Sequence, residues 1–143
     1  MADLVITASA LLLPADNYTK QQGIAGATIT AGQTIYLNTT TVKWHLAQCD
    51  GTAAEAGSGG LAVALNNASA NQPLAYIQTG NLDFGAIITA GTFYVLSDIS
   101  GGIQPVSDFI TSTWLLSPIG YGTSTTTMAL LTSKIGATGV ALA

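Results

Sequence analysis

Hydrophobic residues are arranged along the chain in short runs that glycine-bearing segments separate. Seven of these runs are rich in β-branched and aromatic side chains, which is typical of β-strands. Glycine-bearing segments such as residues 57–60, 80–81 and 120–122 predict turns. The predicted strands cover residues 34–37, 42–47, 61–65, 74–79, 92–97, 112–116 and 126–133.

One predicted strand shows the polarity of its two faces. Val42, Trp44 and Leu46 alternate with Lys43 and His45, so we expect one face to be buried and the other to face solvent or an interface. No stretch keeps a helical period over about three turns, and residues 52–55 form one helical turn at most. Many short strands at this spacing predict an all-β protein: a compact β-sandwich or β-barrel of short antiparallel strands with an extended N-terminal arm.

The N-terminal residues form a segment with a period of two. Leu4, Ile6, Ala8 and Ala10 alternate with residues 5, 7 and 9, which indicates an extended conformation. Two interpretations remain open: an ordinary first strand of the domain, or an arm that adds to the sheet of a neighbour. We divide the chain into an extended N-terminal arm, residues 1–22, and a single β-domain, residues 23–143. The candidate interface residues are the large apolar residues of the arm: Leu4, Val5, Ile6, Leu11, Leu12 and Leu13.

A sequence echo links two distant parts of the chain. Residues 29–37 nearly recur as residues 88–96, with Gln33 as the one extra residue. In both copies an Ala-Gly step precedes a tyrosine-bearing run, and glycine reaches positive φ there without steric cost. The echo has two open explanations, a chance recurrence of turn-then-strand segments or a duplicated half-domain.

The composition excludes several classes of partner. Charged residues make up 7% of the chain, against about 25% in an ordinary soluble domain. Three lysines, no arginine and a formal charge of −4 leave no basic stripe for phosphates, which argues against nucleic-acid binding. No run reaches the ~20 consecutive apolar residues of a transmembrane helix, so no membrane partner is expected. A surface with so little charge favours association, and we expect other chains to cover much of it.

Residues suited to catalysis are few. His45, the one histidine, lies on the polar side of its strand, and Cys49 has no cationic neighbour that would activate a thiol. The carboxylates lie in turn contexts, where aspartate commonly caps backbone amides. Residues 97–102 lack the spaced ligands of a calcium loop, and residues 57–60 lack the lysine of a nucleotide-binding loop. We therefore predict no catalytic residues, no cofactor and no metal site, and a lone cysteine fits synthesis in a reducing cytoplasm.

The turn–strand units follow one another in a particular order. Residues 31–32 lead to Tyr36, and residues 60–64, 72–80, 90–97, 101–105 and 119–122 follow. In this order and spacing, residues 23–136 resemble the small capsid decoration (cement) proteins of tailed bacteriophages. The resemblance implies a non-catalytic virion protein, usually a homotrimer. Such a protein binds the outer surface of the assembled head and stabilises it by bridging subunits of the major capsid protein, after synthesis in the bacterial host cytoplasm. The arginine-free composition and the long apolar start depart from the family's pattern, which leaves open whether the protein binds the shell or another decorating protein.

Two alternative functions remain open. In the first, the protein is a receptor- or glycan-binding module of a head or tail fibre, with Tyr18, Tyr121 and Trp114 stacking on sugars. In the second, it is a minor structural component of the tail or baseplate. For the aromatic strand residues we expect mainly a packing role, with Trp44 and Trp114 filling the core.

Overall fold

The computed structural model describes residues 3–6, 18–109, 113–131 and 140–141. Over these residues the protein is all-β, which confirms the prediction, and its one regular helical element is the short 3-10 helix η2 (Val106–Asp108). The strands are β1 (Tyr18–Ile24), β2 (Thr34–Asn38), β3 (Lys43–Leu46), β4 (Leu61–Ala64), β5 (Pro73–Asp83), β6 (Phe93–Leu96), β7 (Ile103–Pro105), β8 (Leu115–Leu116), β9 (Pro118–Gly122), β10 (Thr127–Leu131) and β11 (Val140–Ala141).

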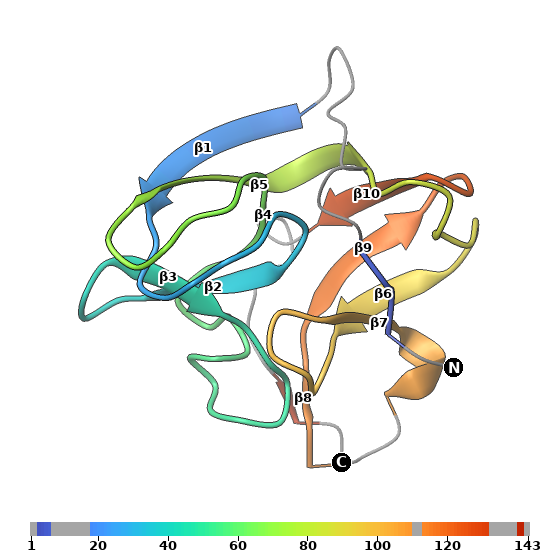
Figure 1. Ribbon diagram of the computed structural model, residues 1–143. Helices are drawn as coiled ribbons and strands as arrows, with labels where there is room; N and C mark the ends of the chain where they lie inside the picture. The colour runs from blue at the N-terminus through green and yellow to red at the C-terminus, as the bar shows by residue number, and fades with distance from the viewer. Residues whose placement is uncertain (1–2, 7–17, 110–112, 132–139, 142–143) are drawn as a thin grey trace.

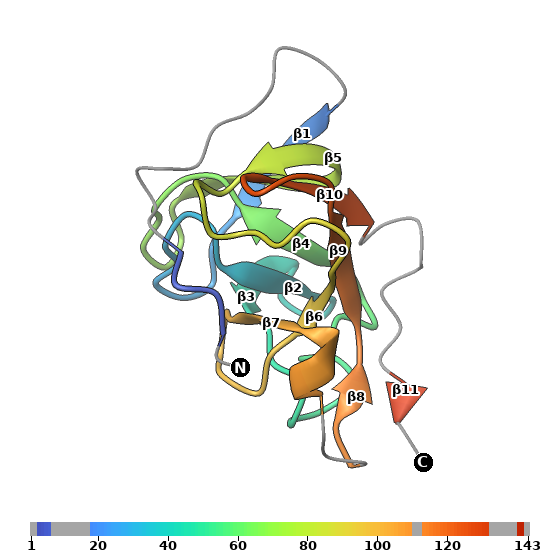
Figure 2. The ribbon, with the colours of Figure 1, turned by 90° about the vertical axis from the view of Figure 1, so that its right-hand side faces the viewer.

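Nine of the described strands form one antiparallel sheet that curls into a half-barrel (Figure 1). Their order across the sheet is β3-β2-β4-β5-β10-β9-β6-β7, and β1 pairs with β5 off this path. Strands β8 and β11 form a separate two-stranded ribbon, at the opposite end of the molecule from β1 (Figure 2). The sheet therefore encloses a core by curling on itself.

The long strand β5 joins the two halves of this sheet. β4 pairs with it at Tyr76 and Ile77, and β10 pairs with it farther along, over residues 79–83. Gly80 lies at the changeover, opposite Tyr18 on one side and Leu130 on the other. Its φ of 107° lies in the region that glycine enters without steric cost. The prediction of a turn at residues 80–81 is therefore wrong. Gly80 adopts a backbone conformation that other residues avoid, but the strand continues through it.

The turn expected at residues 120–122 is also wrong, since these residues lie within β9. Gly120 pairs with Tyr94 on one side and with Leu130 on the other. A side-chain carbon at Gly120 would lie 2.6 Å from the carbonyl oxygen of Ala129, so the residue must be glycine for the strands to approach this closely.

The two halves of the sheet repeat one arrangement. β2 forms a hairpin with β3 and pairs with β4 on its other edge, and β6 likewise forms a hairpin with β7 and pairs with β9. β5 then pairs with β4, as β10 pairs with β9. The path β3-β2-β4-β5 is thus matched by β7-β6-β9-β10, and the two repeats meet where β5 pairs with β10.

The turns that open the two repeats carry the same hydrogen bonds. In the first repeat the Gly32 N–H donates to the Ala64 carbonyl at 2.8 Å, and the Ala64 N–H donates to the Gln33 carbonyl at 2.9 Å. In the second repeat Gly91 and Gly122 make the corresponding pair, with the Gly122 N–H donating to the Thr92 carbonyl, and both distances are 2.8 Å. Because the sequence echo begins each repeat, these matched bonds favour a duplicated half-domain over a chance recurrence.

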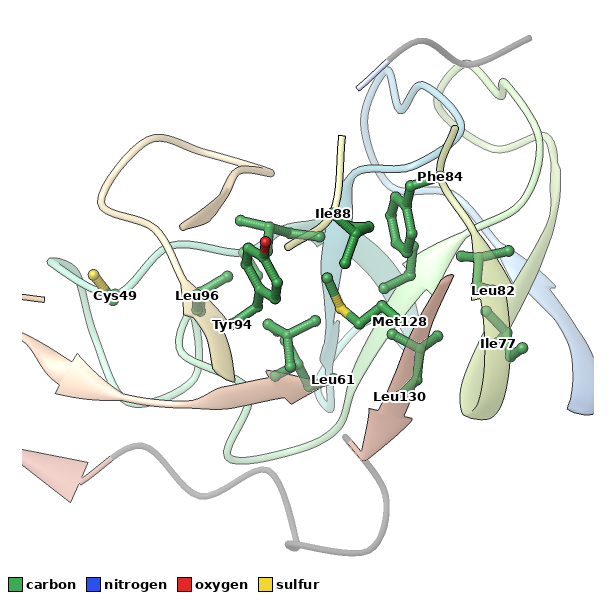
Figure 3. Packing of buried hydrophobic residues seen from close by; sticks show 14 of the residues in the cluster. Cys49, Leu61, Ile77, Leu82, Phe84, Ile88, Tyr94, Leu96, Met128 and Leu130 are labelled. Carbon is green, nitrogen blue, oxygen red and sulfur yellow. The ribbon is translucent and has the colours of Figure 1, made fainter. Parts of the chain in front are cut away.

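Buried side chains form two clusters, one on each side of the first repeat. The main cluster lies inside the half-barrel, where Leu61, Tyr94 and Met128 are directed into a shared interior (Figure 3). The second cluster lies on the outer side of β2, β4 and β5 and contains Trp44, as expected for a core tryptophan. β4 is buried on both faces, because Leu61 and Val63 join the main cluster while Ala62 and Ala64 join the second. Trp114 is only partly buried, against the main cluster.

Part of the region that the sequence analysis includes in the arm is a strand of the main sheet. β1 pairs antiparallel with β5 from Tyr18 to Ile24, so the boundary drawn after residue 22 falls inside a strand. The predicted strand over residues 112–116 is reduced to β8 within the described residues.

The β6–β7 turn contacts the first repeat. The Thr34 N–H donates to the Gly101 carbonyl, and the Cys49 N–H donates to the Ser97 carbonyl.

Candidate functional site

The described part of the N-terminal arm lies along β7. The Leu4 N–H donates to the Ile103 carbonyl at 2.9 Å, and the Ser97 hydroxyl donates to the Asp3 carboxylate at 2.7 Å. Leu4 and Ile6 pack against the main cluster, whereas Val5 between them is 80% exposed. Of the six candidate interface residues, two therefore contact their own domain and one faces outward. Leu11, Leu12 and Leu13 lie outside the described residues.

Acidic side chains surround the start of this segment. Burial raises the pKa of Asp3, Asp98 and Asp108 raise it further, and the hydrogen bond from Ser97 opposes the shift. Asp3 and Asp98 both accept hydrogen bonds from the Ser97 hydroxyl, at 2.7 and 3.3 Å, so these two carboxylates lie together at the β6–β7 turn. This turn is therefore acidic.

An apolar row crosses the outer face of the second repeat. Phe93 of β6 and Tyr121 of β9 are directly paired, and their rings meet edge to face with centroids 4.9 Å apart. Phe93 is 49% exposed and Tyr121 37% exposed. Val106 begins the 3-10 helix η2 directly after Pro105, the partner of Tyr94, and it is 46% exposed. We call Val106, Phe93 and Tyr121 the outer row.

Of this row, the sequence suggests a surface role only for Tyr121. It predicts a strand at Phe93 without indicating that its side chain is exposed, and it predicts nothing for Val106. For Phe93 the available signal was the sequence echo, which aligns it with Ile35 of the first repeat; no sequence signal points to Val106.

His45 and Cys49 both pack against other residues of the domain. The His45 ring stacks on Tyr36, with centroids 5.7 Å apart. Cys49 is fully buried, and burial, followed by the charges of Asp98 and Asp50, raises the pKa of its thiol to about 12. A thiol with such a pKa stays protonated at neutral pH, which is the opposite of an activated nucleophile.

Two carboxylates in turns bind backbone N–H groups, as expected. Asp83 accepts a hydrogen bond from the Gly85 N–H at 2.8 Å, and Glu55 accepts one from the Thr52 N–H at 3.0 Å. Across the described ranges, no group of three or more His, Cys, Asp or Glu side chains is arranged to hold a metal ion. No helix in the same part of the chain has the length and apolar character needed to cross a membrane.

A pocket of about 250 Å³ lies where residues 28–30 meet residues 67–72. Its polar side chains already serve the backbone, since Asn67 accepts from the Ala31 N–H and Gln72 accepts from the Ser69 N–H, each at 2.9 Å. These bonds hold the layer that covers the second cluster.

The aromatic residues suggested for sugar stacking do not form one group of exposed rings. Tyr121 is exposed, but Trp114 is partly buried and meets Phe109 edge to face at 5.8 Å. The side chain of Tyr18 lies outside the described residues. Comparison of the chain with protein-family models and with curated proteins finds no match.

Proposed function

We propose that this protein is a non-catalytic capsid decoration protein of a tailed bacteriophage, which binds the outside of the assembled head and bridges subunits of the major capsid protein. The observation that carries the proposal is an apolar outer row on a compact all-β domain, in a chain of which only 7% of the residues are charged. Such a surface suits large, permanent interfaces, which resemble a domain core cut in half. A protein that binds only the assembled shell stabilises that state by mass action, without any chemistry.

The order of turn–strand units adds support. Each of these units overlaps a strand of the main sheet, in the order β2, β4, β5, β6, β7 and β9. The family also suggests a homotrimer, which native mass spectrometry of the purified protein would detect.

The copy number of the protein in purified virions tests the proposal. Quantitative mass spectrometry would compare it with the major capsid protein, and we expect hundreds of copies, near parity or a simple fraction. A few to a few dozen copies would instead assign the protein to a fibre, tail or vertex. Absence from the particle would refute a virion role.

The arm needs a test of its own, because truncation would also remove Leu4 and Ile6 from the main cluster. A triple variant, Leu11→Ser, Leu12→Ser and Leu13→Ser, changes the arm while leaving residues 3–6 in place. If the arm reaches the shell, this variant keeps the melting temperature of the wild type and loses occupancy on capsids. Full occupancy would restrict the role of the arm to its own domain.

A further inference from the structure

We propose that the outer row of Val106, Phe93 and Tyr121 is the face that docks on the capsid, and that its occupant is a shell subunit offering an apolar contact edged by lysine or arginine. The inference rests on the proposed function and assigns it to one surface of the molecule. Its observations come from the comparison of the two repeats and from the distribution of charge.

The register of the strands fixes which residues correspond in the two repeats. Ile35 pairs with Ala62 in the first repeat, and Phe93 pairs with Tyr121 in the second. In each repeat the next pair along contains the tyrosine of the sequence echo, Tyr36 in the first and Tyr94 in the second. Phe93 therefore occupies the position of Ile35, and Tyr121 that of Ala62.

The first repeat covers this face with its own chain. Ile35 and Ala62 are fully buried under a layer that includes Ala25, Ile29 and Ala68. Ile29 and Ala68 exchange backbone hydrogen bonds of 2.8 and 2.9 Å, which tie residues 25–31 to the connection between β4 and β5. The corresponding positions of the second repeat carry larger apolar side chains and are exposed.

Two local differences leave the second repeat uncovered. The β9–β10 connection comprises only residues 123–126, whereas the β4–β5 connection comprises residues 65–72 and supplies Ala68. Ile88, which matches Ile29 in the sequence echo, packs in the main cluster inside the half-barrel. The outer row thus has the aromatic and aliphatic residues of a covered face without a cover from the described chain.

Two other exposed apolar side chains lie at the turn end of the β6–β7 hairpin, which carries Phe93. Val5 lies beside β7, and Ile99 lies in the β6–β7 turn, 61% exposed. Exposed apolar residues grouped in this way mark interaction sites more often than residues scattered singly. Aromatic residues at the centre of such a group commonly supply most of the binding energy.

The charge beside the row identifies the kind of partner. Asp108 lies two residues after Val106, and Asp3 and Asp98 share the Ser97 hydroxyl at the turn of the same hairpin. A symmetric contact between two copies would present the same acidic edge from both sides. The chain has no arginine and only three lysines to oppose that edge, so a different protein with basic residues around an apolar contact fits better than a second copy.

Capsids that lack the protein test the assignment in a sedimentation assay. The double variant Phe93→Ser, Tyr121→Ser should bind at least about tenfold more weakly than the wild type, because central aromatic contacts are lost. Val42→Ser is the matched control, since Val42 is 67% exposed on the first repeat, and it should bind as the wild type does. Circular dichroism would verify that each variant keeps its fold.

Each outcome of the binding assay supports or contradicts the docking face. Wild-type binding with an unimpaired double variant would overturn the docking face and leave decoration intact, whereas failure of the wild type to bind would overturn decoration and the docking face together. If the double variant instead dissociates an oligomer of the free protein, or loses binding on a glycan array, the occupant is a second copy or a sugar and the assignment is wrong. Association of the wild type should also slow as salt rises, and a rate independent of salt would refute the basic edge of the partner.

Discussion

Gly32 and Gly91 occupy equivalent positions in the two repeats, each at the turn that precedes the first strand of its repeat. Their φ angles are 93° and 83°, in the region that side chains with a Cβ rarely adopt. Each donates its N–H to the strand that pairs with the first strand of its repeat, Gly32 to Ala64 and Gly91 to Gly122. The two turns therefore fix the start of both halves of the sheet in the same way.

Replacing either glycine should destabilise the protein by a similar amount. Gly32→Ala and Gly91→Ala each force positive φ on a residue with a Cβ, at a cost of about 1–3 kcal/mol. At Gly91 the added carbon would lie 3.8 Å from the Tyr121 hydroxyl, an ordinary contact, so the loss there reports backbone conformation alone. Urea unfolding measures the change. Gly91→Asn is the control, because asparagine tolerates positive φ better, and a variant series with no such recovery would contradict the explanation.

Tyr94 and Tyr36 are a second equivalent pair, and their hydroxyl groups differ. The Tyr94 hydroxyl accepts a hydrogen bond from the Thr89 N–H at 2.9 Å beneath the main cluster, whereas in the described chain the Tyr36 hydroxyl makes no hydrogen bond. Tyr94→Phe should therefore cost about 1–2 kcal/mol of the free energy of unfolding, since it leaves the Thr89 N–H without its partner. Tyr36→Phe should stay within about 0.5 kcal/mol of the wild type. Equal effects in denaturant unfolding would show that the hydrogen bond carries no net stability.

The sequence predicts most of the strands that contain β-branched residues and misses two strand segments that depend on glycine. β2, β4 and β6 lie where the short runs place them, because side-chain pattern alone defines them. The pattern predicts turns at Gly120 and Gly80, where the structure has β9 and the second part of β5. Local sequence cannot distinguish a glycine that ends a strand from one that lets two strands approach, since the difference lies in a distant partner such as Ala129.

The candidate site was predictable to a smaller extent. The apolar N-terminal residues stand out in the sequence, but the inward direction of Leu4 and Ile6 depends on the edge of β7, a strand that the short-run pattern did not predict. Exposure of Phe93 follows from the shortness of the β9–β10 connection and the inward position of Ile88. The direction of Leu4 and Ile6 and the exposure of Phe93 thus depend on which segments pack together in the folded chain.

Substitutions in residues 4–6 should separate the inner and outer sides of the arm. Leu4→Ala removes a partly buried side chain from the main cluster and should cost roughly 1–2 kcal/mol, below the range for fully buried leucine. Val5→Ala should change stability by less than about 0.5 kcal/mol, because Val5 is exposed. Thermal unfolding of the two variants provides the comparison. Equal losses would contradict the alternation of inward and outward side chains along this segment.

The buried thiol of Cys49 should make stability depend on pH in the alkaline range. In the unfolded chain the thiol titrates near its ordinary pKa of 9.0, and in the folded protein burial raises the pKa to about 12. Between these values the unfolded state has lost a proton that the folded state keeps, so the free energy of unfolding decreases as pH rises, while below this window the thiol has no effect. Burial also raises the pKa of Tyr36 and Tyr76, which adds a decrease of the same sign above their ordinary value of 10.0.

The variant Cys49→Ala isolates the contribution of the thiol, because both tyrosines remain. Urea midpoints measured from about pH 7 to pH 10.5 should fall less steeply for the variant than for the wild type, even though the variant starts from a lower stability after losing the buried sulfur. Iodoacetamide labelling at about pH 8 supplies an independent readout, since the thiolate is the reactive form: Cys49 should react in urea and resist in the folded protein. Parallel pH profiles for the two proteins, or rapid labelling of the folded chain, would mean that the thiol is accessible to solvent.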